Sequence, residues 1–360
     1  MLDRNRLDRV LTNLNQTGLD QMIISDPLAI KWLTGRRFYA GERFLGLYIA
    51  KDREPVLLLN ALFQFDEDLG VRKLLHKDTD DIIPFIQSVV DPRKKLGVDK
   101  ILTAKFLLPM IDRGVAVRIE NGSPGVDRTR AVKDEEEKEL MRISSKINDM
   151  AMEQFKGLVH EGVTEREVAA QTLDIYKSLG AEAFSFPSIV AFGANAADPH
   201  HMPDDTVVKE GDTVLFDVGC MYHGYCSDMT RVFFFKKEPS SVQKKIYNIV
   251  RKANEDAEAM VKAGITLHSI DKTARDVIRA EGYGEYFTHR LGHFIGLEDH
   301  EAGDVAENNM TLTEAGNIFS IEPGIYKADE AGVRIEDLVI VTEDGCEVLN
   351  RFPKDIQIIG

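Results

Sequence analysis

Two aspartates in the segment from Thr213 to Phe235 have a spacing that suits a divalent cation. The segment reads TVLFDVGCMYHGYCSDMTRVFFF, which is typical of two strands folded back on each other. Asp217 and Asp228 are equally distant from a turn at Tyr222 and His223, so a simple antiparallel hairpin places them opposite each other. Opposed carboxylates among apolar side chains repel unless a cation lies between them. The alternative is that one aspartate lies in the turn and the other faces solvent, which leaves no metal site.

A second cluster of reactive side chains lies between residues 289 and 301. Its sequence is HRLGHFIGLEDHE, and it contains three of the nine histidines of the chain. The glycines within it let the backbone approach other groups closely. His289, His293 and His300 are therefore candidates for metal binding or proton transfer, although a single histidine is more often a core or surface residue.

Two glutamates form a further acidic pair. Glu322 follows the apolar run FSI and Glu336 follows GVRI, and a turn rich in Ala, Asp and Gly separates the two segments. With the two aspartates and one histidine they make an oxygen-rich ligand set with a single imidazole. Such a set suits Mn, Fe(II), Co or Zn and excludes a thiolate site. Four carboxylates offset the charge of two divalent metal ions. Two metal ions held close together activate water for hydrolysis.

The elements that must position these residues follow from the hydrophobic pattern. Strands are predicted at 188–193, 213–219, 226–235, 317–322 and 333–342. Capping boxes predict helices after Thr164 and Ser240. An acidic turn, DEEEKE, begins an earlier helix whose apolar face comprises Leu140, Ile143, Ile147 and Met150. This half of the chain is predicted to be an α+β domain with a mainly antiparallel sheet and helices packed on one side.

The first half of the chain is predicted to form a separate, smaller domain. Residues 4–15 place Leu7, Val10, Leu11 and Leu14 on one stripe of a helix. Short strand-like and helix-like stretches then alternate to about residue 121, the pattern of a small α/β domain. The sequence GSPG at 122–125 is the clearest break in the 360 residues. We therefore predict domains at 1–124 and 125–360.

Composition restricts the partners of the protein. Acidic residues outnumber basic ones by 60 to 45, for a formal net charge of −15, so neither nucleic acid nor an anionic membrane is an expected partner. The negative charge instead favours the binding of small cationic groups such as metal ions and free amino termini. No apolar segment is long enough to span a bilayer, and the first residues do not resemble a signal peptide. Three cysteines without CxxC spacing fit a reducing compartment, and a cytoplasmic location is expected.

Five motifs together resemble the pita-bread metallopeptidases, which include methionine aminopeptidase, aminopeptidase P and prolidase. The motifs are FDVG with SDMTR, PHHMP, HRLGHFIGLEDHE, IEPGIY and VRIED, and they cover about residues 130–360. The resemblance implies an α+β pita-bread domain after a smaller N-terminal α/β domain similar to those of prolidase, aminopeptidase P and creatinase. It also implies two divalent ions per subunit, with manganese expected and cobalt, zinc or iron as alternatives. The positions that match the metal ligands of the family are Asp217, Asp228, His293, Glu322 and Glu336, of which Asp228 and Glu336 bridge the ions.

The resemblance also implies roles for other residues. His200, in the motif PHHMP, matches a substrate-side histidine, and His300 matches the histidine that stabilises the tetrahedral intermediate. Glu322 is expected to transfer a proton to the leaving nitrogen. His289 and Arg334 match substrate-binding positions of the proline-cleaving branch. The neighbouring His201 has no counterpart and is expected on the surface.

The predicted activity is hydrolysis of Xaa-Pro bonds in small peptides, and the chain is most similar to Xaa-Pro dipeptidase, or prolidase. Xaa-Pro aminopeptidase is the alternative. A dipeptidase needs a cation for the free carboxylate of proline, and Arg334 or an arginine of residues 36–43, from the same subunit or from a partner in a homodimer, has the right charge. A creatinase-like C–N hydrolase and a non-catalytic binding scaffold are more remote alternatives, because the five ligands are intact and no basic tail is present.

Overall fold

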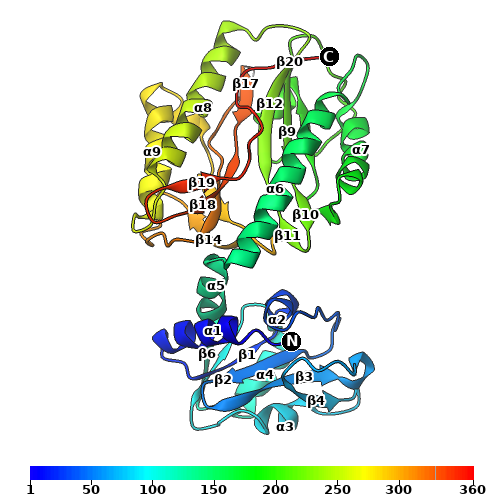
Figure 1. Cartoon of the computed structure of the whole chain (residues 1–360), viewed down its shortest axis with the longest axis vertical. Helices are drawn as coiled ribbons and strands as arrows, with labels where there is room; N and C mark the ends of the chain where they lie inside the picture. Colours follow the sequence, from blue (N-terminus) through cyan, green and yellow to red (C-terminus); the bar gives the residue numbers. More distant parts are fainter. Residues whose placement is uncertain (329) are drawn as a thin grey trace. The chain divides into compact units, whose positions relative to one another are not determined.

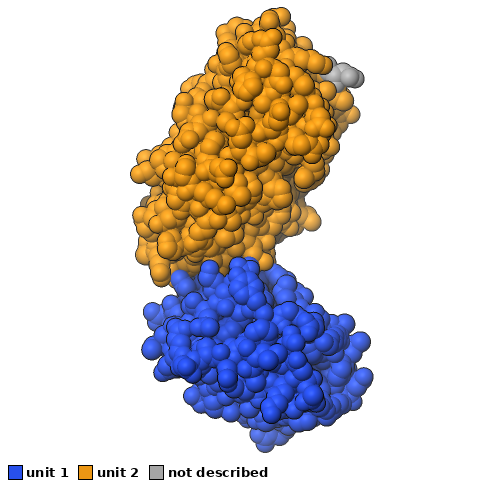
Figure 2. Space-filling model, turned by 90° about the vertical axis from the view of Figure 1, so that its right-hand side faces the viewer, with its two compact units in different colours: residues 1–130 blue, residues 131–360 orange. Residues whose placement is uncertain are grey.

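The chain folds into two compact units. The computed structural model describes residues 1–328 and 330–360. Its two units are Met1–Arg130 and Ala131–Gly360, which Figure 2 colours separately. The boundary that we predicted after residue 124 falls inside the helix α5 (Ser123–Ala131). The GSPG sequence begins this helix, because proline is tolerated in a first helical turn and Asn121 caps the backbone N–H of Ser123.

The N-terminal unit is built on one mixed sheet of order β4-β3-β2-β1-β5-β6 (Figure 1). The predicted first helix is confirmed, with Leu7, Val10 and Leu14 buried and Asp3 as its N-cap. The elements of this unit before α5 are α1 (Arg4–Gln16), β1 (Gln21–Ile24), α2 (Pro27–Thr34), β2 (Gly46–Ala50), β3 (Arg53–Asn60), η1 (Ala61–Phe63), β4 (Arg72–His76), α3 (Ile82–Gln87), β5 (Lys95–Val98), α4 (Ala104–Asp112) and β6 (Arg118–Asn121).

The second unit contains four α-helices among short strands in its described residues. Its helices are α6 (Glu135–Lys156), α7 (Glu165–Ser178), α8 (Ser241–Met260), α9 (Leu267–Ala280) and the short η2 (Gly193–Ala197) and η3 (Gly284–Tyr286). Its first strands are β7 (Ala183–Phe184), β8 (Ile189–Phe192), β9 (Thr213–Val218), β10 (Cys220–Tyr222), β11 (Tyr225–Cys226) and β12 (Met229–Phe235). The later strands are β13 (Gly292–Phe294), β14 (Glu301–Val305), β15 (Ile318–Ile321), β16 (Gly324–Lys327), β17 (Ala331–Arg334), β18 (Asp337–Val341), β19 (Cys346–Val348) and β20 (Ile358–Ile359).

The helix starts of this unit follow the sequence signals. Both capping boxes form, so α7 begins after Thr164 and α8 after Ser240. The predicted face of α6 is wrong in part, since Met150 is exposed. The buried face of α6 includes small or polar residues such as Ser144 and Asn148, which a search for large apolar side chains passes over.

Helices cover both sides of the sheet that contains β9 and β12, so the prediction that they pack on one side is wrong (Figure 1). This sheet has the order β20-β12-β9-β8, and a second sheet has the order β14-β13-β15-β18-β19. One face of β9 packs against α6 and α7 through Val214 and Phe216. Leu215, on its other face, belongs to the core formed with α8 and α9. The continuous apolar runs of β9 and β12 are the signal of a sheet buried on both faces.

The hairpin from β9 to β12 has a different register from the predicted one. Asp217 lies opposite Thr230, and not opposite Asp228. The turn is formed by His223 and Gly224, which both have positive φ, of 48° and 83°. A two-residue hairpin turn requires positive φ at both positions, and this places the turn one residue later than a count from the two aspartates does.

Within residues 1–328 and 330–360, each helix is too short or too polar to cross a lipid bilayer.

Gly224 is expected to be required for this turn. Gly224→Ala places a β-carbon on a residue at φ 83° and should lower the free energy of unfolding by about 1–2 kcal/mol. Urea unfolding monitored by circular dichroism measures the change. Gly345→Ala is the control, because this glycine has no positive φ and its β-carbon would meet no atom closer than 3.9 Å. Equal stability of the Gly224→Ala variant and the unmodified protein would contradict the assigned turn.

Candidate metal centre

The first two predicted ligands lie on one face of the β9–β12 hairpin. Asp217 is in β9 with Thr230 opposite to it on β12. Asp228 lies just before β12, two residues from Thr230, and side chains two apart on a strand point to the same face. The two aspartates are therefore diagonal neighbours across the hairpin. They lie close enough that the charge of Asp217 acts on the carboxyl of Asp228.

The two glutamates meet at a break in a second hairpin. β15 pairs with β18, β16 pairs with β17, and both pairs keep the same register, which places Glu322 opposite Glu336. The ladder is interrupted here because Pro323 has no N–H to donate. Residues 333–342, which we predicted as one strand, are therefore two strands with Glu336 between them.

His293 joins the group from the neighbouring strand β13. Its Nδ1 lies 3.3 Å from the carbonyl oxygen of Phe294, so Nδ1 carries the proton and Nε2 carries the lone pair. Nε2 is 3.6 Å from Asp228 Oδ2 and 3.5 Å from Glu322 Oε1. Burial, and next the charge of His300, lower the pKa of His293 to about 3, which keeps the imidazole neutral. A neutral imidazole that donates its other N–H to a carbonyl is the usual form of a metal-bound histidine.

Four of the five predicted ligands line one cavity of about 470 Å³, and the fifth, Asp228, lies beside two of them. Ligand atoms of Asp228, His293 and Glu336 all lie within 4.8 Å of one another, while Asp217 and Glu322 line the same cavity. The residues around it are Ile189, Pro199, His200, Asp217, His289, Arg290, His293, His300, Glu322, Arg334 and Glu336. Asp228, His293 and Glu336 are thus spaced for binding one ion, because two ligand atoms that each lie about 2.0–2.2 Å from an ion are at most about 4.4 Å apart.

Two buried carboxylate oxygens of the predicted ligands lack a hydrogen-bond partner among the described residues. They are Oδ1 of Asp217 and Oδ1 of Asp228. A buried carboxylate oxygen without a donor is destabilising unless a cation contacts it. The donor set is four carboxylates and one neutral imidazole, with no thiolate. It fits divalent Mn, Fe, Co or Zn, and the ligand assignment itself stays a prediction.

Burial and mutual repulsion make the charged form of these carboxylates unfavourable, as expected of groups that bind a cation. Burial raises the pKa of Asp228 and of Glu336 well above the usual range, and repulsion from neighbouring carboxylates adds to both shifts. Burial raises the pKa of Glu322 to about 8. Protein donors compensate the glutamates only in part, since Thr230 Oγ1 donates to Glu336 Oε2 at 2.6 Å and Ser320 Oγ donates to Glu322 Oε1 at 3.2 Å.

A chain of hydrogen bonds leads from Asp217 to His289. Arg334 Nη2 donates to Asp217 Oδ2 at 2.5 Å, and its Nη1 donates to the hydroxyl of Tyr326 at 2.8 Å. That hydroxyl lies 2.9 Å from His289 Nε2, while His289 Nδ1 lies 2.6 Å from the carbonyl oxygen of Arg290. His289 Nδ1 therefore donates and Nε2 accepts from Tyr326. Burial, reinforced by the charge of Arg334, lowers the pKa of His289 to about 4.

The other predicted histidines lie at the rim of the cavity. His300 is exposed, and its ring centroid is 3.9 Å from that of His293. His200 is exposed and also lines the cavity. Asp299 is an acidic neighbour that we had not assigned: its Oδ1 is buried with no hydrogen-bond partner among the described residues. Burial and the charge of Asp217 raise the pKa of Asp299 to about 6.

Other site residues were also missed, although the sequence carried a signal for them. Thr230 and Ser320 stand two residues after Asp228 and two before Glu322, so strand alternation places each on the face of its ligand. Tyr326 closes the motif IEPGIY.

The segment that carries His200 is held by a second acidic group. Glu165 is fully buried and accepts hydrogen bonds from the backbone N–H groups of Phe192 and Asp204. Its Oε2 is also 2.6 Å from His201 Nε2. Because protein donors satisfy both oxygens of Glu165, this group has a structural role. The expectation that His201 lies on the surface is wrong, since its side chain is only 13% exposed.

A larger cavity, of about 620 Å³, lies in the N-terminal unit. Arg37, Tyr39, Arg43, Ile101 and Phe106 are among its lining residues. The described residues of this unit contain no group of His, Cys, Asp and Glu side chains spaced for a metal ion. We therefore place the chemistry in the smaller cavity.

Comparisons with known proteins agree with this geometry. Residues 139–343 match metallopeptidase family M24, and residues 6–132 match the creatinase/prolidase N-terminal domain. The chain belongs to metallopeptidase family M24. It is therefore a metallopeptidase, and the predicted fold, a pita-bread domain after a smaller N-terminal domain, is confirmed. Membership also implies divalent metal ions.

The M24 relatives match along almost their whole length. An uncharacterised peptidase of Staphylococcus epidermidis is 38% identical over 344 residues, which cover 95% of this chain and 97% of the relative. The solved dipeptidase PepE of Mycobacterium ulcerans has a TM-score of 0.92 and 31% identity, covering 99% of this chain and 97% of that one. The Xaa-Pro dipeptidase of Bacillus anthracis has a TM-score of 0.89 and 32% identity, covering 99% of both chains.

Without metal, this M24 protein should become less stable as the pH rises from about 7 to about 8. The buried histidines are neutral in this range, whereas folded Glu322, with a pKa of about 8, keeps a proton that the unfolded chain has lost. The free energy of unfolding should therefore fall, by up to about 1.4 kcal/mol per pH unit for each such proton. Urea unfolding of chelator-treated protein measures the slope.

Glu322→Gln is the control for this slope. It removes one of the protons, so the slope should be shallower. Some slope should remain, because burial also raises the pKa of Glu258 to about 8. Equal slopes for the two proteins would contradict the raised pKa of Glu322.

Proposed function

We propose that the protein is a dinuclear-metal exopeptidase that hydrolyses Xaa-Pro dipeptides, an Xaa-Pro dipeptidase. The observation that carries the proposal is the convergence of three carboxylates and a neutral imidazole on one cavity, with Asp228 beside them. A buried oxygen of each aspartate lacks a donor among the described residues. Both similar dipeptidase structures support it. The acidic centre favours a substrate with a free amino group, which an exopeptidase requires.

Five residues are proposed to hold the metal ions. They are Asp217, Asp228, His293, Glu322 and Glu336, with Asp228 and Glu336 shared between two ions. When bound, two such ions lower the pKa of a water molecule and polarise a carbonyl group. Arg334 and Thr230 orient Asp217 and Glu336 by direct hydrogen bonds.

The chain's own side chains are proposed to move the protons and bind the peptide. Glu322 transfers a proton to the leaving imino nitrogen. His300, at the rim beside His293, donates a hydrogen bond to the oxygen that becomes negatively charged. His200 and His289 line the cavity and contact the substrate.

The carboxylate of the dipeptide needs a cation. Arg334 lines the cavity, and its contacts with Asp217, Thr230 and Tyr326 use three of its five N–H groups. An arginine of residues 36–43 from a partner subunit is the other candidate, which implies a homodimer. We further propose manganese as the metal and the cytoplasm as the location, because the ligands are hard and the cysteines are free.

Glu336→Gln should change activity and stability in opposite directions. Hydrolysis of an Xaa-Pro dipeptide should fall by more than about 100-fold, because even residues that only orient metal ligands contribute about 10–100-fold. The melting temperature of the metal-free protein should rise, because folding forces the Glu336 carboxyl either to bury a charge or to keep a proton, and glutamine does neither. Assays with added manganese and thermal unfolding with chelator measure the two effects. Retained activity would refute the ligand assignment.

The length of the substrate separates the dipeptidase from an Xaa-Pro aminopeptidase. An Xaa-Pro dipeptide should have a kcat/KM about tenfold or more above that of the tripeptide with one further residue, because a cation that binds the proline carboxylate contributes a charge-assisted hydrogen bond. Equal or faster cleavage of the tripeptide would favour the aminopeptidase.

A further inference from the structure

Three buried side chains hold the backbone of the segments that carry the proposed ligands. Asn350 Nδ2 donates to the carbonyl oxygen of Asp228 at 3.1 Å. Arg231 Nη1 donates to the carbonyl oxygen of Glu336 at 2.7 Å. Asn254, on α8, donates to two further carbonyl groups. None of these three residues lines the cavity, so they act on the ligands through the main chain.

Asn254 bonds the two peptide groups that precede the glutamates. Its Nδ2 lies 2.9 Å from the carbonyl oxygen of Ile321 and 3.4 Å from that of Ile335. These carbonyls belong to the peptide bonds whose nitrogens are those of Glu322 and Glu336. They lie where the ladder between β15 and β18 ends. One side-chain amide therefore connects the two strands at the point where the glutamates face each other.

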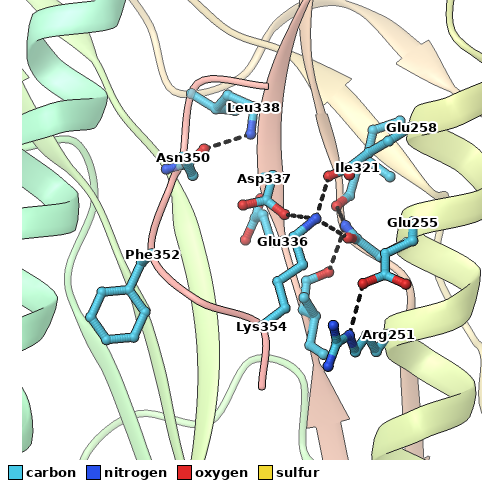
Figure 3. Close-up of polar contacts among 12 residues, drawn as sticks. Arg251, Glu255, Glu258, Ile321, Glu336, Asp337, Leu338, Asn350, Phe352 and Lys354 are labelled. Carbon is cyan, nitrogen blue, oxygen red and sulfur yellow. Dashed lines mark hydrogen bonds and ion pairs between the residues drawn. The ribbon is translucent and has the colours of Figure 1, made fainter. Parts of the chain in front are cut away.

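Lys354 fixes the orientation of this amide. Its Nζ donates to Asn254 Oδ1 at 2.6 Å, so the Asn254 NH₂ group must face the two carbonyls. The same ammonium group contacts Glu258 Oε1 at 2.7 Å and Asp337 Oδ2 at 2.6 Å (Figure 3). Asp337 follows Glu336, and its Oδ1 accepts a hydrogen bond from Arg231 at 2.6 Å. Figure 3 shows Lys354 extending from the C-terminal segment toward Asp337 and Glu258.

We propose that Asn254 and Lys354 are positioning residues that set the separation of Glu322 and Glu336 and thereby the affinity of the metal centre. This inference rests on the ligand assignment in the proposed function. Asn254 is fully buried. An apolar residue of similar size would fill its space but take the Asn254 donor away from the carbonyls of Ile321 and Ile335. The two peptide groups would then rotate toward other partners and carry both glutamates with them.

Calorimetric titration of the chelator-treated full chain with Co²⁺ tests the proposal. Asn254→Leu should raise the dissociation constant for cobalt about 10–100-fold, because this is the usual effect of losing a group that orients metal ligands. The matched control is Asn317→Leu, which removes another buried amide of the same unit, one that donates to the carbonyl oxygen of Ala131. Thermal unfolding of both metal-free variants shows how much stability each loses.

The outcomes separate positioning from general destabilisation. Weaker cobalt binding by Asn254→Leu than by Asn317→Leu supports the proposal. Equal affinity of Asn254→Leu and the unmodified protein, or an equal loss in both variants, overturns it. If the unmodified protein itself binds no cobalt, the proposed ligands are wrong, and the proposed function fails together with the inference.

Lys354 provides a second test that does not depend on the folding of Asn254→Leu. Lys354→Met should also weaken cobalt binding, and Lys354→Arg, which keeps a donor, should restore part of it. The double variant Lys354→Met with Glu258→Gln also removes one of the two carboxylates that Lys354 contacts, and the other, on Asp337, keeps its ion pair with Arg231. If the lysine orients Asn254, the double variant should still bind cobalt weakly. Full recovery of the affinity would show that the lysine only balances charge, and would overturn the positioning role.

Discussion

Repulsion between buried carboxylates is the constraint on which the catalytic unit depends. Asp217, Glu322 and Glu336 line one cavity and Asp228 lies beside them. Burial raises the pKa of Asp228, Glu322 and Glu336. Like charges in a low-dielectric interior repel more strongly than one neutral hydrogen bond can offset. The surrounding structure reduces this repulsion in part: Arg334 donates a hydrogen bond to Asp217, and two hydroxyl groups donate to the glutamates. These contacts leave an oxygen of each aspartate without a protein donor among the described residues, and cations at the proposed site would supply the remaining compensation.

Interruptions in the strand ladders bring these carboxylates together. Asp228 lies between β11 and β12, and Glu336 lies between β17 and β18. Pro323 ends the ladder directly after Glu322. A regular ladder sends successive side chains to opposite faces. At a break, a single residue can depart from that alternation. The backbone carbonyl groups there need donors from outside the ladder, and Asn254 and Arg231 supply such donors.

Patterns among neighbouring residues predicted many of the helices and strands, but few of the contacts between residues that are distant in the sequence. The capping boxes at Thr164 and Ser240 were sufficient for two helix starts, because both partners of a capping box lie within one turn. The hairpin register was wrong, since a count between two aspartates takes no account of the positive φ of His223. The role of Asn254 had no local signal, because the carbonyl that it binds is 67 residues away. In its own helix it is one polar residue among several.

The position of Lys354 in the C-terminal segment separates the proposed ligands from a residue that orients their backbone. A protein cut between Asn350 and Lys354 would keep all five proposed ligands but lose the ammonium group that donates to Asn254. On the positioning role proposed above, proteolysis at this place would weaken metal binding without removing a proposed ligand.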